Sequence, residues 1–115
     1  MNYVDGYIIP VPLAKREAYI TQANFAAGIF KEFGALRIVE TWGNDVPPDE
    51  LTSFPMAVKC EPDEVVVFSW IEWPSKSARD EGMKKFMADT RLASMEMPFD
   101  GKRMIFGGFQ MIVEK

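Results

Sequence analysis

The segment from Glu64 to Trp73 constrains the fold of this chain more than any other part of the sequence. It reads Glu-Val-Val-Val-Phe-Ser-Trp-Ile-Glu-Trp and is rich in the β-branched and aromatic residues that favour strands. Successive side chains of a strand point to opposite faces of its sheet, and here both sets are mostly apolar, with Val67 and Ile71 on one face and Phe68 and Trp70 on the other. An antiparallel strand with one wet face would instead alternate apolar and polar residues. We therefore expect a central strand in a sheet that is covered on both faces.

The remaining segments predict further strands and two helices. Strands are expected at Tyr3–Val11, Leu36–Trp42 and Arg103–Val113, helices at about Ala14–Phe33 and from Ser75 to about Asp89, an irregular segment at Asn44–Pro55, and a short extra strand at Met56–Cys60. The expected buried stripes are Tyr19, Ala23, Ala26, Phe30 and Phe33 on the first helix, and Gly82, Met83, Phe86 and Met87 on the second. Gly34 suits the left-handed residue that ends a helix, and Ser75 can cap the start of the next one.

This order of elements predicts the fold class. Strand, helix, strand, strand, helix and strand in succession are the split βαβ arrangement of ferredoxin-like α+β domains, in which a four-stranded antiparallel sheet carries both helices on one face. The helical crossovers follow the first and third strands, which places these two strands in the middle of the sheet. Because the chain has 115 residues and no long linker, we expect one domain spanning residues 1–115.

The second face of such a sheet needs a cover that the two helices cannot supply. Burying a large aliphatic or aromatic side chain is worth about 1.5–3 kcal/mol, so an apolar sheet face left in water would forfeit a large share of the stability. An identical copy is the simplest cover, because a two-fold contact lets one apolar patch serve both subunits. We expect a homodimer with the two sheets packed face to face. The alternative is that Asn44–Pro55 folds back over the sheet of its own subunit.

The residue types that the chain lacks limit its chemistry. It has no histidine, which excludes Ser-His-Asp and Cys-His catalysis and histidine ligation of a metal or haem. Its one cysteine, Cys60, can form neither an internal disulfide nor a cysteine zinc site, and the carboxylates show no metal-loop spacing. We therefore expect no metal and no cofactor, and an inert Cys60.

Charge and hydropathy limit the partners. The chain has 13 Lys and Arg against 17 Asp and Glu and no cluster of basic residues, so nucleic acid is not an expected partner. No apolar run approaches the roughly 20 residues that a membrane span needs. The start, Met1 to Asp5, lacks the basic and apolar regions of a signal peptide. We expect a cytoplasmic protein with no membrane partner.

Several stretches of the sequence resemble a known bacterial family. They are Tyr3–Gly6, Gly43–Pro47, Leu51–Pro55, Val67–Trp70, Ala78–Asp80 and Met97–Ile105. In these stretches the chain resembles the uncharacterised YbaA-like proteins, which carry domain of unknown function 1428. The resemblance implies membership of the dimeric α/β-barrel superfamily, in which ferredoxin-like subunits pair through their sheets. It implies no reaction, because that superfamily includes cofactor-free monooxygenases, haem-degrading enzymes and isomerase-like proteins as well as dimers without known chemistry.

Arg79 is the first candidate for a ligand site between the helices and the sheet. On a helical wheel it falls on the side that faces the sheet, where a guanidinium needs a partner because it cannot shed its charge cheaply. If Arg79 serves a ligand, it anchors an anionic group of that ligand. The structural alternative is an ion pair with Asp5, Glu40 or Glu72, or a side chain that reaches out to solvent.

Three other residues complete the candidate site. Tyr7 lies on an expected central strand and could donate a hydrogen bond to a substrate oxygen, although a buried tyrosine with a local partner is the common alternative. Trp70 and Phe99 could supply apolar walls, although use in the core or at an interface is the default for such residues.

The sequence leaves two functions open and identifies no catalytic residue. One is a small-molecule-binding or cofactor-independent enzyme-like domain with its pocket between helices and sheet, acting on an aromatic or carbonyl compound. The other is a non-catalytic homodimer whose apolar surfaces are structural or serve a protein partner. An enclosed cavity beside Arg79 would favour the first, and an ion pair of Arg79 within a filled core of its own subunit would favour the second.

Overall fold

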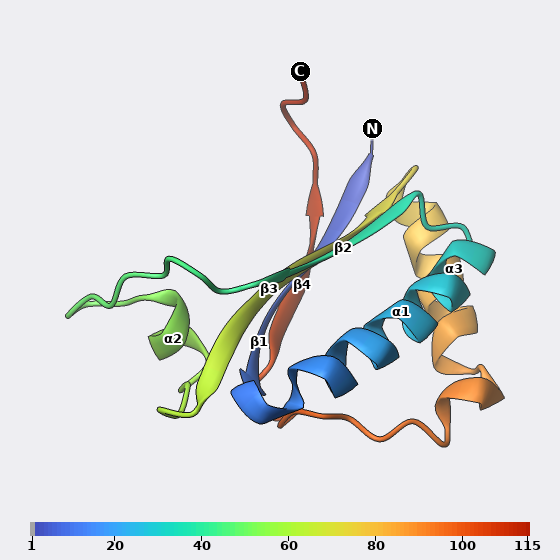
Figure 1. Cartoon of the computed structure of the whole chain (residues 1–115). Coiled ribbons are helices and arrows are strands. Elements are labelled where there is room, and N and C mark those ends of the chain that lie inside the picture. Colours follow the sequence, from blue (N-terminus) through green and yellow to red (C-terminus); the bar gives the residue numbers. More distant parts are fainter. Residues whose placement is uncertain (1) are drawn as a thin grey trace.

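The computed structural model describes residues 2–115 as one four-stranded sheet with two long helices packed on one side (Figure 1). The strands are β1 (Tyr3–Pro12), β2 (Arg37–Trp42), β3 (Glu64–Trp73) and β4 (Ile105–Gln110), and the helices are α1 (Arg16–Glu32), α2 (Phe54–Ala57) and α3 (Lys76–Met87), with 3₁₀ turns at Leu13–Lys15 and Thr90–Leu92. None of the helices within residues 2–115 combines the length and the apolar character that a bilayer crossing needs.

The sheet has the order β2-β3-β1-β4 with every neighbouring pair antiparallel. The first and third strands are therefore central, as the crossover argument predicts, and the ferredoxin-like α+β fold is confirmed. β3 has the bounds that its apolar run predicts, because it pairs with β1 along its whole length and with β2 from Val67 to Glu72.

The core lies between the sheet and the helices α1 and α3. One cluster of buried side chains surrounds Trp73, which is fully buried and meets the ring of Phe30 of α1 edge to face at a centroid distance of 6.3 Å. A second cluster surrounds Val67, also fully buried, and includes Tyr19 of α1. The other residues of the two clusters fill the space between the sheet and the helices. The end of α1 follows its sequence signal, because Gly34, which comes after the helix, has φ +107°.

Two local predictions are wrong. The segment expected as a strand at Met56–Cys60 instead contains the second half of the short helix α2 and the turn after it, because the Ser53 side chain accepts a hydrogen bond from the backbone N–H of Met56 and a proline stands in the first turn. Met87, the last residue of α3, is 76% exposed rather than buried.

The last strand is shorter than Arg103–Val113. Regular pairing of β4 with β1 ends at Gln110, and beyond it one hydrogen bond, from the backbone N–H of Met111 to the carbonyl of Asn2, holds the chain. Ile112 and Val113 then extend into solvent, 84% and 76% exposed.

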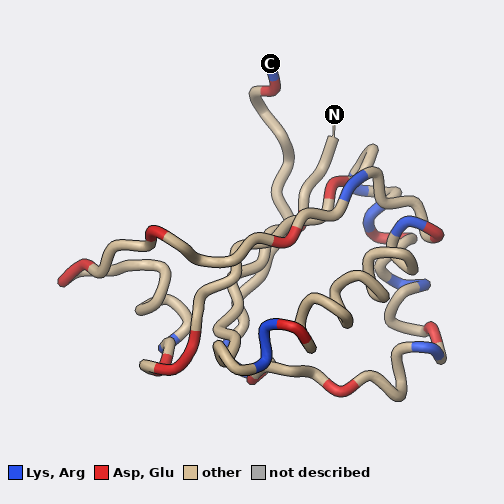
Figure 2. The backbone as a smooth tube through the Cα atoms, in the orientation of Figure 1, with Lys and Arg blue, Asp and Glu red and all other residues tan. Residues whose placement is uncertain are grey.

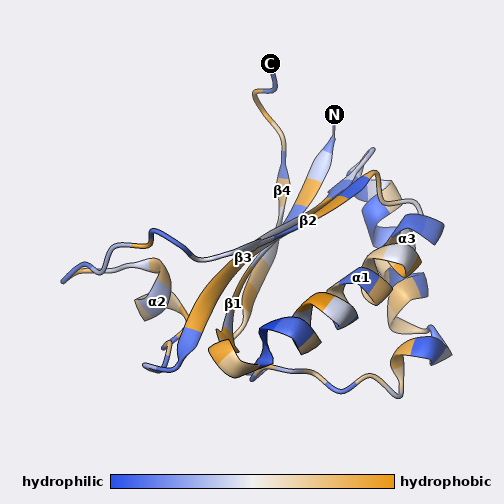
Figure 3. Ribbon diagram, in the orientation of Figure 1, coloured by the Kyte–Doolittle hydropathy of each residue, from blue (hydrophilic) through white to orange (hydrophobic). Residues whose placement is uncertain are grey.

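The face of the sheet opposite α1 and α3, called the outer face below, is apolar and largely open. Phe68, Ile105 and Phe109 are 46%, 43% and 59% exposed there. In Figure 3 the strands carry long hydrophobic stretches, whereas in Figure 2 the charged residues gather mainly on the helices and loops. Of the helices within residues 2–115, α2 lies on this side, where the ring of Phe54 meets that of Phe68 at 6.1 Å. The excursion of Asn44–Pro55 over its own sheet thus covers one end of the outer face and leaves the centre uncovered.

Candidate functional site

One row of side chains crosses all four strands on the face that carries α1 and α3. Glu40 of β2 is opposite Ser69 of β3, Ser69 is opposite Tyr7 of β1, and Tyr7 is opposite Phe106 of β4. Directly opposed residues point to the same face and neighbouring strands lie about 4.8 Å apart, so the four side chains form a continuous row, called the helix-side row below. Tyr19 of α1 hydrogen-bonds to Glu40, which places the row beneath that helix.

Glu40 is the acidic end of the helix-side row. Its Oε1 accepts a hydrogen bond from the Tyr19 hydroxyl at 2.6 Å. Glu40 is exposed as a residue of the edge strand, but its carboxyl end lies against α1, and burial there raises its pKa while the hydroxyls of Tyr19 and Ser69 only partly oppose the shift. A carboxyl group in this setting can accept a proton or a hydrogen bond from a ligand.

Tyr7 stands in the middle of the row with an unengaged hydroxyl. Within residues 2–115 the tyrosine hydroxyls that form hydrogen bonds are those of Tyr3 and Tyr19, and Tyr7 has none. Burial raises the pKa of Tyr7, and the carboxylates of Asp5 and Glu40 raise it further, so the group stays protonated and able to donate. Its ring is half-buried and stacks against Phe106, which is 71% exposed and leaves the row open at β4.

Arg79 of α3 faces the sheet, and its partners are side chains of its own chain. Its Nε lies 3.4 Å from Asp5 Oδ1, its Nη1 lies 3.2 Å from Asp80 Oδ1, and its Nη2 donates to the Tyr3 hydroxyl at 2.8 Å. The guanidinium also lies over the Tyr3 ring, 4.8 Å from its centroid. Of the structural partners named from the sequence, Asp5 is the one found, and Trp73 Nε1 donates to its other oxygen at 3.0 Å. A ligand role for Arg79 stays a prediction.

Gly108 explains why the guanidinium can reach this position. It faces the helices from β4 opposite Asp5, and a Cβ there would collide with Nη2 of Arg79 and lie 2.8 Å from a ring carbon of Tyr3. The close approach allowed by the glycine pair of this strand is therefore made at Gly108 by the chain's own Arg79 and Tyr3.

Trp70 and Phe99, the two walls expected for one pocket, lie on opposite sides of the sheet. Trp70 is opposite Gly6 on the outer face, where its Nε1 donates to Glu72 Oε2 at 2.9 Å. Phe99 packs against Tyr19 on the helix side, with ring centroids 5.9 Å apart. Trp70 cannot line the space that Tyr7 faces, because adjacent residues of a strand point to opposite faces.

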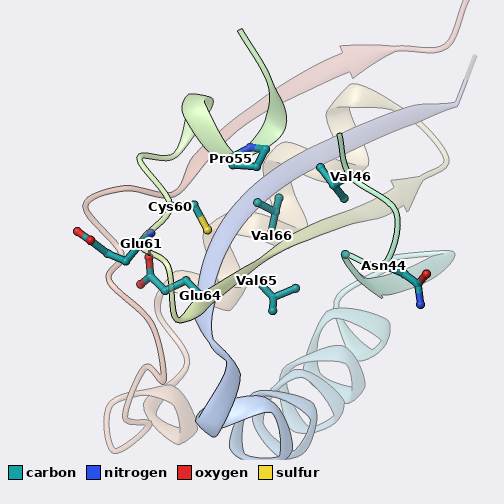
Figure 4. Close-up of a pocket in the computed structure, with 9 residues that line it drawn as sticks. Asn44, Val46, Pro55, Cys60, Glu61, Glu64, Val65 and Val66 are labelled. Atoms are coloured by element: carbon teal, nitrogen blue, oxygen red, sulfur yellow. Dashed lines mark hydrogen bonds between the residues drawn. The ribbon is translucent and has the colours of Figure 1, made fainter. Parts of the chain in front are cut away.

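A separate concavity of about 310 Å³ lies between α2 and the neighbouring ends of β2 and β3 (Figure 4). Its lining includes Val46, Pro55, Val66 and Cys60. Burial and the nearby carboxylates, Glu64 first among them, raise the pKa of the Cys60 thiol, which disfavours the reactive thiolate. Residues 2–115 bring no three acidic or cysteine side chains together as a metal site. Two carboxylates, Glu61 and Glu64, also line the concavity, and Glu64 is already paired with Arg103.

The family follows from comparison with known sequences. The family model described as a protein of unknown function (DUF1428) matches residues 2–101. The chain belongs to this family. It is 56% identical, over 117 aligned residues that cover 100% of both chains, to the uncharacterized protein YbaA of Escherichia coli K12 and equally to that of Shigella flexneri. The resemblance carried by the sequence motifs is confirmed.

Two solved structures share the fold of this family member. A crystal structure named for an antibiotic biosynthesis monooxygenase of Bacillus cereus aligns with a TM-score of 0.54 at 12% identity, covering 99% of this chain and 96% of that one. SnoaB, a cofactor-independent oxygenase from Streptomyces nogalater, aligns with a TM-score of 0.54 at 13% identity, covering 98% and 95%. At such identities the likeness shows the fold alone.

Sequence reasoning missed the two groups that define the acidic end of the row. It treated Tyr19 as a core residue and named Glu40 only as a partner for Arg79. Strand parity was the available signal, because Ile38 and Trp42 share the apolar face of β2 with Glu40, and a carboxylate among them must face the helices. The contact with Tyr19 depends on how α1 docks, which the sequence does not give.

Proposed function

We propose that this protein is a homodimer that binds a small organic molecule at the helix-side row, either as a binding protein or as a cofactor-independent enzyme. The observation that carries the proposal is the unengaged hydroxyl of Tyr7, between an open aromatic neighbour, Phe106, and the carboxyl group of Glu40. The Tyr7 hydroxyl has no hydrogen-bond partner within residues 2–115 and is not sealed from solvent, so a ligand oxygen can reach it.

The chemistry of the row supports either role. Glu40, with its raised pKa, can accept a proton, and Tyr7 can donate a hydrogen bond to a ligand oxygen. Two relatives in fold are named for oxygenases, and SnoaB is described as cofactor-independent, which supports small-molecule chemistry on this fold without fixing a reaction.

The competing function is a non-catalytic homodimer. The ion pairs of Arg79 with Asp5 and Asp80 favour it, because they remove the anchor that the sequence offered for an anionic ligand. The two functions give Tyr7 different roles, because in a purely structural dimer its hydroxyl binds no ligand.

Substitution of Tyr7 by phenylalanine tests the site. A library of small aromatic and carbonyl metabolites is screened by thermal shift, and compounds that raise the melting temperature are titrated against both proteins. Tyr7→Phe should weaken binding of a ligand by up to about tenfold, the worth of one neutral hydrogen bond. Without ligand its stability should change by less than about 0.5 kcal/mol, because the hydroxyl has no partner to lose.

Two results would contradict this site. One is a library that leaves the melting temperature of the wild type unchanged. The other is a Tyr7→Phe protein that loses stability while binding every ligand as the wild type does, since the hydroxyl would then serve the fold.

The homodimer is proposed from the outer face. Phe68 of β3 and Ile105 and Phe109 of β4 lie exposed there, on the two strands that flank β1, and α2 covers only the end of the face near Phe54. An apolar face of this kind on a soluble chain marks an interaction surface, and a two-fold contact with a second copy covers it with matching residues. The cytoplasmic location expected from the sequence stays a prediction.

Substitution of Phe109 by aspartate tests the dimer. Sedimentation velocity at micromolar concentration should show a dimer for the wild type and a monomer for Phe109→Asp, since two rings worth about 1.5–3 kcal/mol each leave the interface and two charges enter it. The control is Phe25→Asp on α1, because Phe25 is 47% exposed and lies away from the outer face. A monomeric wild type, or a Phe109→Asp protein that is still a dimer, would show that the outer face is not a dimer interface.

A further inference from the structure

We infer that the ligand of the helix-side row carries a positive charge, as an ammonium group attached to a small apolar body. The inference rests on the proposed function, because it names the charge class of the molecule bound at that same site. It follows from an inventory of the charges and aromatic rings that face the row.

The basic side chains near the row are already engaged. Arg79 is held by Asp5, Asp80 and the Tyr3 hydroxyl. Arg16, at the start of α1, binds Glu17 at 3.2 Å. Neither forms an ion pair with the acidic end of the row.

One of the two carboxylates facing this layer lacks a basic partner. Asp5 has Arg79 and the indole N–H of Trp73. Glu40 has only hydroxyl groups, from Tyr19 and Ser69, and no Lys or Arg of residues 2–115 forms an ion pair with it. A partly buried carboxylate without a countercharge favours a cation, because each partner removes part of the other's desolvation cost.

Two aromatic rings lie beside this carboxylate, and two more stand further along the row. Tyr19 contacts Glu40 directly and Trp42 lies two residues along on the same face of β2, whereas Tyr7 and Phe106 lie two and three strands away in the sheet. Ring faces attract ammonium and guanidinium groups, and a carboxylate beside aromatic rings is a common way to hold an amine. The chain already uses this attraction at Tyr3, which lies under Arg79, and at Trp42, where the guanidinium of Arg16 lies 5.4 Å from the ring centroid.

The charges near the row disfavour an anionic ligand. It would approach the carboxylates of Glu40 and Asp5, while Arg16 and Arg79 are already in ion pairs, and like charges in a partly buried site repel strongly. A neutral alcohol could accept from Tyr7 or donate to Glu40, but it would gain nothing from the charge. The expected order of affinity is therefore ammonium, then alcohol, then carboxylate.

Three probes of one skeleton test this order: 2-phenylethylammonium, 2-phenylethanol and phenylacetate. Each is titrated into the full-length protein at pH 7.5 and followed by backbone amide NMR. The ammonium should bind on the order of tenfold more tightly than the alcohol, with shifts at Tyr7, Glu40, Ser69 and Phe106. Glu40→Gln should remove that preference, and Glu81→Gln, which deletes an exposed carboxylate of α3, should keep it.

The outcomes separate this inference from the proposed function. Equal or tighter binding of the alcohol or the carboxylate at the row would overturn the charge class and leave the small-molecule site intact. An ammonium preference that survives Glu40→Gln would also overturn it. If none of the three probes shifts the row, the ammonium inference fails, whereas the proposed function fails only if the wider metabolite library fails as well.

Discussion

Replacing Gly82 of α3 by alanine is expected to destabilise the protein by about 3 kcal/mol. Gly82 is buried against the fully buried ring of Trp73, and a Cβ there would collide with that ring and lie 2.6 Å from the carbonyl oxygen of Phe33. The ring is fixed by its packing and the carbonyl belongs to the backbone at the end of α1, so α3 must move away from the sheet. Such a shift disturbs the core cluster around Trp73.

Gly28 of α1 provides the matched control. It also lies inside a helix, but nothing lies within 4 Å of a Cβ at that position. Gly28→Ala should therefore stabilise the protein by about 0.5–1 kcal/mol, the usual gain from replacing glycine in a helix. Both variants are measured by urea unfolding, followed by circular dichroism at one protein concentration. A stability change of the same sign in the two variants would contradict this account of α3 packing.

The fold could be predicted because its signals are local and agree with one another. The apolar run of β3 gave both bounds of that strand, and the order of strands and helices gave the sheet order. The exception is α2, whose sequence contains a helix start that the prediction did not use. Ser53 caps a helix whose first turn contains Pro55, whereas the apolar content of the segment had suggested a strand.

The site was less predictable because it depends on contacts between elements. The helical wheel placed Arg79 correctly toward the sheet, but the sequence could not choose between a ligand and Asp5, which is 74 positions away in the chain. Trp70 and Phe99 were expected in one pocket because both side chains are aromatic. The alternation of side chains along β3 instead puts Trp70 on the outer face, whereas Phe99 packs against Tyr19 on the helix side. Glu40 became a candidate only when the docking of α1 brought Tyr19 to it.

Substitution of Trp73 by phenylalanine is the second change with a large expected effect, about 3 kcal/mol at pH 7. The side chain is fully buried, and its indole Nε1 donates to Asp5 Oδ2 at 3.0 Å. Phenylalanine leaves a cavity beside Gly82 and removes a hydrogen bond to a buried charged group. The comparison is Trp70→Phe, in which a half-buried indole loses a similar bond to Glu72 at the outer face. That change should cost less than about 1 kcal/mol, because water can replace the bond.

The loss caused by Trp73→Phe should also depend on pH. Burial already holds the pKa of Asp5 above its ordinary value of 3.8, against the opposing effects of Arg79 and the Trp73 N–H. Removing that N–H raises the folded-state pKa further, because one donor to the charged form is lost. A folded-state pKa above the unfolded one favours folding at low pH, and this gain disappears as the pH rises through the folded-state pKa. The stability difference from the wild type should therefore be smallest near pH 4 and largest near pH 7, as measured by urea unfolding across that range. A difference that stays constant with pH would show that the indole acts through packing alone and that its bond to Asp5 contributes nothing.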